Sequence, residues 1–191
     1  MKISGKFVLK VAGTLTIIAL VVAALLGVVD MVTRDKIDAI NVEKTNQALA
    51  AVAPEGAEFT PVELSDAAVA AAAAYGTLDS MYEMSTGGYA MKIVASGSQG
   101  SIEMIVGVDA NKALTGVSVV SHSETGGIGT KVINNDPNSA GTPVLDQFIG
   151  MSGAGSLVVG KTVTPISGAT VTTKGITAGC NAALAAVEAM G

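Results

Sequence analysis

The first long feature of the chain is a stretch without any charged residue, residues 11–29, which is dominated by aliphatic side chains. At a rise of about 1.5 Å per residue, a helix of this length spans nearly 30 Å, the thickness of a bilayer core. The pattern therefore predicts a transmembrane helix. A cleaved signal peptide is the alternative, which the length of the run and the lack of a clean small-x-small site after it disfavour.

The charges that flank this stretch predict its orientation. Three lysines and no acidic residue precede it, whereas acidic and basic residues are mixed after it (Asp30, Arg34, Asp35, Lys36, Asp38). By the positive-inside rule, the N-terminus at 1–10 is cytoplasmic and the rest of the chain is extracytoplasmic. We expect a single-pass protein of the cytoplasmic (inner) membrane.

Residues 30–86 read as a helical stalk and a linker. A rough apolar stripe over 35–53, formed by Ile37, Ile40, Leu49 and Val52, predicts a helix that Pro54 ends. Proline and glycine in 54–66 indicate a linker, and the alanine-rich run 67–74 indicates a second, short helix.

From residue 87 the hydrophobic period changes to two. Apolar residues alternate along 89–95 and again along 102–108, and a Gly-Ser-Gln-Gly turn at 97–100 joins the two runs. A further turn at 109–112 leads to a third strand through Val117, Val119 and Val120. We expect a β-meander that begins a domain of residues 87–191. The fold class is α+β, with an antiparallel or mixed sheet and packed helices.

The remainder of the domain is a long connection followed by a helix. Residues 134–156 are rich in Asn, Asp, Pro, Ser and Gly, with a short buried element at Val144, Leu145, Phe148 and Ile149. An apolar run at 157–159 predicts a strand before the last helix, which runs from about Thr173 to Met190 and places Cys180 in the core.

Candidate chemistry lies where this last helix begins, in a turn of small and hydroxyl residues: Ser167, Gly168, Ala169, Thr170, Val171, Thr172 and Thr173. Small residues allow a ligand to approach the backbone, and a helix start offers free N–H groups to a phosphate. We expect the hydroxyls of Thr172 and Thr173 at the helix cap. A turn that only caps the helix is the alternative.

The tetrapeptide from Ser167 to Thr170 resembles the flavinylation motif of FMN-binding domains. These occur in the G subunits of Rnf complexes (RnfG) and in the C subunits of Na⁺-translocating NADH:quinone reductases. The resemblance implies FMN bound covalently through a phosphoester to Thr170, with Thr172 as second choice. The chain departs from the family at Thr164, where an acidic residue is usual.

A second block supports the resemblance. Residues 122–131 look like the family's "ETPGLG" segment, with Gly126 where proline is usual. The resemblance implies that this loop lies against the flavin, and its candidate residues are Glu124, Thr125, Gly126, Gly127, Ile128, Gly129 and Lys131. Glu124 would accept a hydrogen bond from the isoalloxazine or from the backbone, and Lys131 would offset negative charge.

Composition excludes several other classes of function. The net charge of −5 argues against a nucleic-acid partner. A single cysteine excludes an internal disulfide and a cysteine-ligated iron–sulfur cluster within the chain, and a single histidine excludes a histidine-rich metal site. We assign no metal ligands and no catalytic residues, because no nucleophile–base pair or nucleotide-binding glycine motif is visible.

The resemblance implies an electron-transport flavoprotein. It would be a subunit of an ion-translocating ferredoxin:NAD⁺ oxidoreductase, a translocase, with no complete activity alone. Its partners would be Rnf subunits A, B, C, D and E, the lipid bilayer and, during maturation, an FMN transferase. Three alternatives stay open: the C subunit of the quinone reductase, a stand-alone anchored flavoprotein of extracellular electron transfer, and an anchored binding or structural module without flavin.

Overall fold

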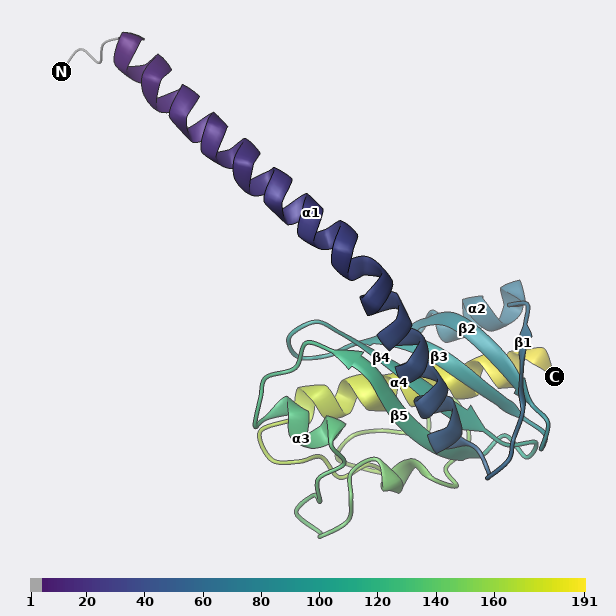
Figure 1. Ribbon diagram of the computed structural model, residues 1–191. Helices are drawn as coiled ribbons and strands as arrows, with labels where there is room; N and C mark the ends of the chain where they lie inside the picture. The colour runs from purple at the N-terminus through teal and green to yellow at the C-terminus, as the bar shows by residue number, and fades with distance from the viewer. Residues whose placement is uncertain (1–4) are drawn as a thin grey trace. The chain divides into compact units, whose positions relative to one another are not determined.

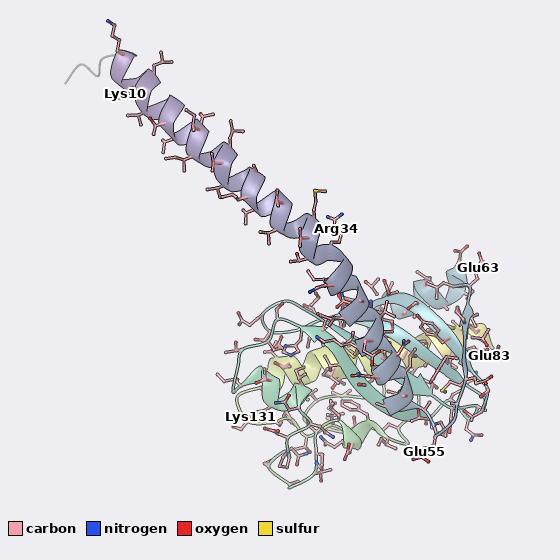
Figure 2. The ribbon with its side chains drawn as sticks, viewed as in Figure 1. Lys10, Arg34, Glu55, Glu63, Glu83 and Lys131 are labelled. Atoms are coloured by element: carbon pink, nitrogen blue, oxygen red, sulfur yellow. The ribbon has the colours of Figure 1, made fainter. Side chains whose placement is uncertain are left out.

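The computed structural model describes residues 5–191, and the chain forms two units, Met1–Glu43 and Lys44–Gly191. Helix α1 (Gly5–Val52) is continuous and ends just before Pro54, as predicted. Within it, Val8–Arg34 is long and apolar enough to cross a membrane, and this stretch is not buried. Its aliphatic side chains project on all sides between Lys10 and Arg34 (Figure 2). The apolar helix predicted at 11–29 is confirmed, although the first part of the predicted cytoplasmic end, 1–4, lies outside the described residues.

The second unit is built on a five-stranded sheet with the order β1-β2-β3-β4-β5 (Figure 1). Its strands are β1 (Phe59–Val62), β2 (Thr77–Met84), β3 (Tyr89–Ser96), β4 (Ser101–Val108) and β5 (Leu114–His122). Every neighbouring pair is antiparallel. The predicted meander of β3, β4 and β5 and the α+β class are confirmed.

Two strands lie in the segment predicted as stalk and linker, 30–86. The prediction of a linker at 54–66 was wrong, because β1 pairs there with β2. Pro61 is tolerated in β1 because this strand is at the edge of the sheet, where a missing backbone N–H costs no ladder bond. The alanine-rich helix is confirmed as α2 (Asp66–Ala72), whose start is capped by the hydroxyl of Ser65.

Helix α4 (Thr170–Met190) covers one face of the sheet, together with α2 (Figure 1). The main core of the unit lies between them: side chains at alternate positions of β3 and β4, such as Met91, Ile93 and Met104, pack with Ile176 and Leu184 of α4. The prediction that Cys180 is a core residue is also confirmed, since it is fully buried.

The other face of the sheet packs on the last residues of α1, which belong to this unit. A smaller cluster joins Ala48, Leu49 and Val52 to Met84, Ala90, Ile105 and Val120. The predicted stripe is therefore correct only at its C-terminal end, because Ile37 and Ile40 are exposed. The Thr115 hydroxyl donates to the carbonyl of Val52 at 2.5 Å and helps to fix the helix end on the sheet.

The connection between β5 and α4 differs from prediction in three places. It contains α3 (Gly129–Ile133), so the last three residues of the predicted glycine loop, 129–131, are helical. A 3-10 turn, η1 (Asp146–Phe148), buries Phe148 as expected, but Ile149 is exposed. The run 157–159 is not a strand: the carbonyl of Val158 accepts three N–H groups from residues 161–163, which closes a turn around Gly160.

Candidate flavin site at the start of helix α4

Helix α4 begins at Thr170, three residues earlier than predicted, and its N-cap is Ala169. Gly168 has φ of +83°, a backbone conformation that favours glycine, and lets the chain turn sharply into the helix. The N–H of Ala169 donates to the carbonyl of Ile166 at 3.0 Å, and no side chain caps the helix start. Since the first N–H groups of a helix lack partners within it, this uncapped start suits an anionic group such as a phosphate.

The three threonines of the motif have different surroundings. The side chain of Thr170 is exposed at the first position of the helix, beside the exposed residues Ser167 and Gly168. Thr172 is 1% exposed and its hydroxyl donates to Glu124 Oε2 at 2.5 Å. Thr173 is fully buried and its hydroxyl donates to the carbonyl of Ala169 at 3.1 Å. The expectation that Thr172 and Thr173 cap the helix was therefore wrong, because both lie within its first turns.

Glu124 is buried beneath this helix start rather than being a solvated loop residue. Its Oε1 accepts the backbone N–H groups of Ser98 and Gln99 at 2.7 and 3.2 Å, while Oε2 accepts the Thr172 hydroxyl. The predicted hydrogen bonds from the backbone are therefore confirmed. Burial raises the pKa of the Glu124 carboxyl, but the bonds from Thr172, Gln99 and Ser98 and the charge of His122 lower it more, so the pKa lies below its ordinary value.

Most of the rest of the glycine-rich segment lies at the surface, next to the buried Glu124 in the chain. The N–H of Gly127 donates to the Thr130 hydroxyl at 2.8 Å, and the N–H of Ile128 donates to the carbonyl of Thr125 at 3.2 Å. Ile128 is 51% exposed, and Gly126, at the family's proline position, faces open space. Lys131 is exposed on α3, at the surface of the unit (Figure 2). The structure thus brings both predicted blocks together, through Glu124, Gly129 and Thr172.

Two side chains near the motif carried no recognisable signal in the sequence. Gln147 binds the backbone of Thr164, the residue that stands where the family usually has an acidic side chain. The Gln147 Oε1 accepts the Thr164 N–H at 2.9 Å, and the Gln147 Nε2 donates to the Thr164 carbonyl at 3.0 Å. Lys174 is exposed one helical turn after Thr170, and therefore on the same face of α4. A cation there can offset the charge of a group attached to Thr170.

Comparison with known proteins agrees with this geometry. The family model described as the FMN-binding domain matches residues 97–185, a range that contains every predicted site residue. A second model, described as the RnfG N-terminal region, matches residues 1–52. In these two regions the chain is similar to the RnfG family. Its FMN-binding domain includes β4, β5, α3 and most of α4.

Relatives of this family resemble the chain over nearly its whole length. The G subunit of the Na⁺-translocating ferredoxin:NAD⁺ oxidoreductase complex of Acetobacterium woodii is 29% identical, covering 94% of this chain and 91% of the relative. The G subunit of an ion-translocating oxidoreductase complex of Methanosarcina acetivorans is 28% identical, with 97% of both chains covered. A shorter match, 50% identical over 40 residues, links the chain to the corresponding protein of Aliivibrio fischeri.

Proposed function

We propose that this chain carries FMN through a phosphoester bond to Thr170 and relays electrons within a membrane-bound, ion-translocating oxidoreductase complex of the Rnf type. The observation that carries the proposal is the contrast among the three threonines. Only the hydroxyl of Thr170 belongs to an exposed side chain, whereas those of Thr172 and Thr173 are buried and engaged. Of the three threonines, Thr170 is therefore the one that a transferase can reach.

The surroundings of Thr170 fit a phosphoester. Attachment would join the Thr170 oxygen to the flavin's phosphorus and break the P–O bond to the departing group, which is water for FMN itself or a nucleoside monophosphate for a flavin dinucleotide. The hydroxyl proton would be lost, so the chain would gain FMN less water. The N–H groups and dipole of the α4 start favour the remaining negative charge, and Lys174 adds a cation. The carboxylate of Glu124 is turned into the interior, where hydrogen bonds from Ser98, Gln99 and Thr172 stabilise its charge. Bound FMN supplies one- and two-electron chemistry, which the protein positions and tunes.

The partners follow from the relatives and from what the sequence lacks. Both long relatives are named as subunits of ion-translocating oxidoreductase complexes, one of them ferredoxin- and NAD⁺-dependent. With one cysteine, which is buried, this chain holds no cysteine-ligated cluster. Electrons therefore arrive from and leave to other subunits of the complex, for which we propose Rnf subunits A to E. An FMN transferase acts during maturation.

The location proposed for the flavin is outside the cytoplasm. The apolar stretch of α1 anchors the chain as a single pass in the cytoplasmic membrane. Lysines at positions 2, 6 and 10 keep the N-terminus inside, which places residues 87–191 on the opposite side. There, a covalent bond prevents loss of FMN by diffusion.

The intact mass of the full-length protein, extracted from membranes of cells that contain the transferase, tests the attachment. We expect wild type and Thr172→Val to carry FMN less water, and Thr170→Val to lack it. Loss of the added mass only in Thr172→Val would move the site to Thr172. No added mass in wild type, with no flavin released on denaturation, would overturn the flavoprotein proposal.

A further inference from the structure

One carboxylate joins three parts of the chain that are distant in sequence. Glu124 lies in the segment after β5, its Oε1 accepts two N–H groups of the β3–β4 turn, and its Oε2 accepts the hydroxyl of Thr172 on α4. The partners are 25, 26 and 48 residues away along the chain. The described part of the protein contains no buried side-chain nitrogen or oxygen without a partner, and this carboxylate is satisfied entirely by these bonds.

We infer that Glu124 is a positioning residue: through the Thr172 hydroxyl it holds the first turn of α4 in place, and thereby orients Thr170 and the flavin attached to it. The inference rests on the proposed function, since it assigns a role in presenting a flavin at Thr170. It also gives Thr172 a role other than attachment.

The start of α4 depends on this contact because it has no ordinary cap. The N-cap residue is Ala169, whose side chain cannot accept a hydrogen bond, and no other side chain takes that role. Thr172, in the first turn, is therefore the point where a side chain ties the start of the helix to the body of the domain. Thr170 lies in the same turn, so any fraying of that turn moves the attachment point directly.

Close packing leaves the carboxylate little freedom to rearrange. A Cβ added at Gly97 would overlap Glu124 Oε1, and one added at Gly129 would lie 2.5 Å from Glu124 Oε2 and 2.9 Å from Thr172 Oγ1. The β3–β4 turn, the segment before α3 and the helix start thus interlock around this group. Removing the Thr172 hydroxyl leaves Oε2 buried without a donor, a costly arrangement that the helix start can relieve by moving away.

The chain offers a matched control on the same helix. Thr177 is also buried, at 4% exposed, and its hydroxyl donates to a helix carbonyl, that of Thr173, at 2.8 Å. Thr177→Val removes a buried hydroxyl from α4 with the same change of shape as Thr172→Val, but it does not touch Glu124. Thr172→Ser keeps the hydroxyl and removes only the methyl group.

The experiment measures the mobility of the flavin rather than electron transfer. Full-length wild type and the variants are matured with the transferase, and three quantities are recorded: FMN per chain by intact mass, flavin fluorescence anisotropy, and fluorescence quenching by iodide. In Thr172→Val we expect FMN still on Thr170, a clear drop in anisotropy and at least a twofold rise in the iodide quenching constant. Thr172→Ser and Thr177→Val should resemble wild type.

The outcomes separate this inference from the proposed function. A wild type with FMN, together with a Thr172→Val variant whose anisotropy and quenching match wild type or match Thr177→Val, would overturn the positioning role alone. A wild type without FMN would instead remove the proposed function. If Thr172→Val does not fold, Thr172→Ala, which also removes the hydroxyl, replaces it: lower anisotropy there supports the inference, and wild-type anisotropy and quenching overturn it.

Discussion

The apolar stretch of α1 and helix α4 are both rich in apolar residues, but they have opposite surroundings. None of the Val8–Arg34 stretch is buried by protein, whereas most residues of α4 from Thr172 to Val187 are buried. A helix that is apolar on all sides is either enclosed in a protein core or spans a membrane. The α1 stretch is apolar on all sides and is not enclosed by protein, whereas α4 is enclosed although the exposed Lys174 and Glu188 make part of its surface polar.

The two helices also differ in side-chain size. Large aliphatic residues such as Leu15, Leu20 and Leu25 form the surface of the α1 stretch, and such side chains suit contact with lipid. Helix α4 instead has glycine and alanine where it approaches the sheet: a Cβ at Gly175 would lie 2.6 Å from the carbonyl oxygen of Ser96. Small residues let the backbones of a helix and a sheet come close. Residue size therefore distinguishes the two helices in the same sense as hydropathy does, since among the described helices only the α1 stretch is apolar enough to cross a membrane.

The largest effect is expected from charges placed in the α1 stretch. In Leu20→Asp/Val21→Asp, two carboxylates at the centre of the stretch cost roughly 6 kcal/mol of membrane insertion, at about 3 kcal/mol each. We expect the variant to leave the membrane fraction while the melting temperature of its folded domain stays unchanged. Carbonate extraction and thermal unfolding measure the two properties, and a domain that melts earlier would contradict the separation between helix and domain.

The next effect concerns the glycine contact of α4. Gly175→Ala should destabilise the domain by about 3 kcal/mol, because the added methyl meets the backbone of Ser96, which cannot rotate away. Gly179→Ala is the matched control: its methyl would meet the flexible end of Met104, which can change rotamer, so we expect a loss nearer to about 1 kcal/mol. Chemical denaturation measures both. Equal losses would show that α4 shifts as a unit.

Elements whose apolar residues keep one regular spacing were predictable from the sequence, and elements in which that spacing changes were not. Strands β3 and β4 alternate regularly and were predicted correctly. In β2 the buried residues are Leu78, Met81 and Met84, spaced by three as in a helix, because the register shifts after Leu78 and Met84 packs on the other face of the sheet. A local pattern cannot reveal such a shift.

The site was predictable only where side-chain identity carries the signal. The motif at Thr170 and the segment at Glu124 could be recognised, and they meet through the Thr172 hydroxyl. The groups that hold Glu124 from the other side are the backbone N–H groups of Ser98 and Gln99, which any residue except proline would supply, so they leave no signal in the sequence. The start of α4 was misplaced for a related reason. Thr172 and Thr173 are good cap residues in general, yet their hydroxyls are used inside the helix, and the turn at Gly168 begins it earlier.

A smaller effect should appear on acidification, and it comes from the contact between Glu124 and α4. The folded-state pKa of Glu124 lies below its ordinary value of 4.5, so its ionised form stabilises the fold above that pH. This stabilisation is lost as the pH falls through the depressed pKa. We expect the melting temperature to fall below pH 4.5 less steeply in Glu124→Gln than in wild type. Parallel curves for the two proteins would contradict this.

The smallest effect is expected at the polar end of the α1 stretch, where Arg34 and Asp30 form an ion pair at 2.8 Å. Both side chains are mostly exposed, 69% and 59%, and lie one helical turn apart. Such pairs contribute about 0.3–0.5 kcal/mol to helix stability and are screened by salt. Arg34→Gln should therefore lower the helicity of a detergent-solubilised peptide of residues 5–52 only slightly, and only at low salt. Circular dichroism at two salt concentrations measures this. A large loss would mean that a single charge pair, rather than the aliphatic surface around it, keeps this end of α1 helical.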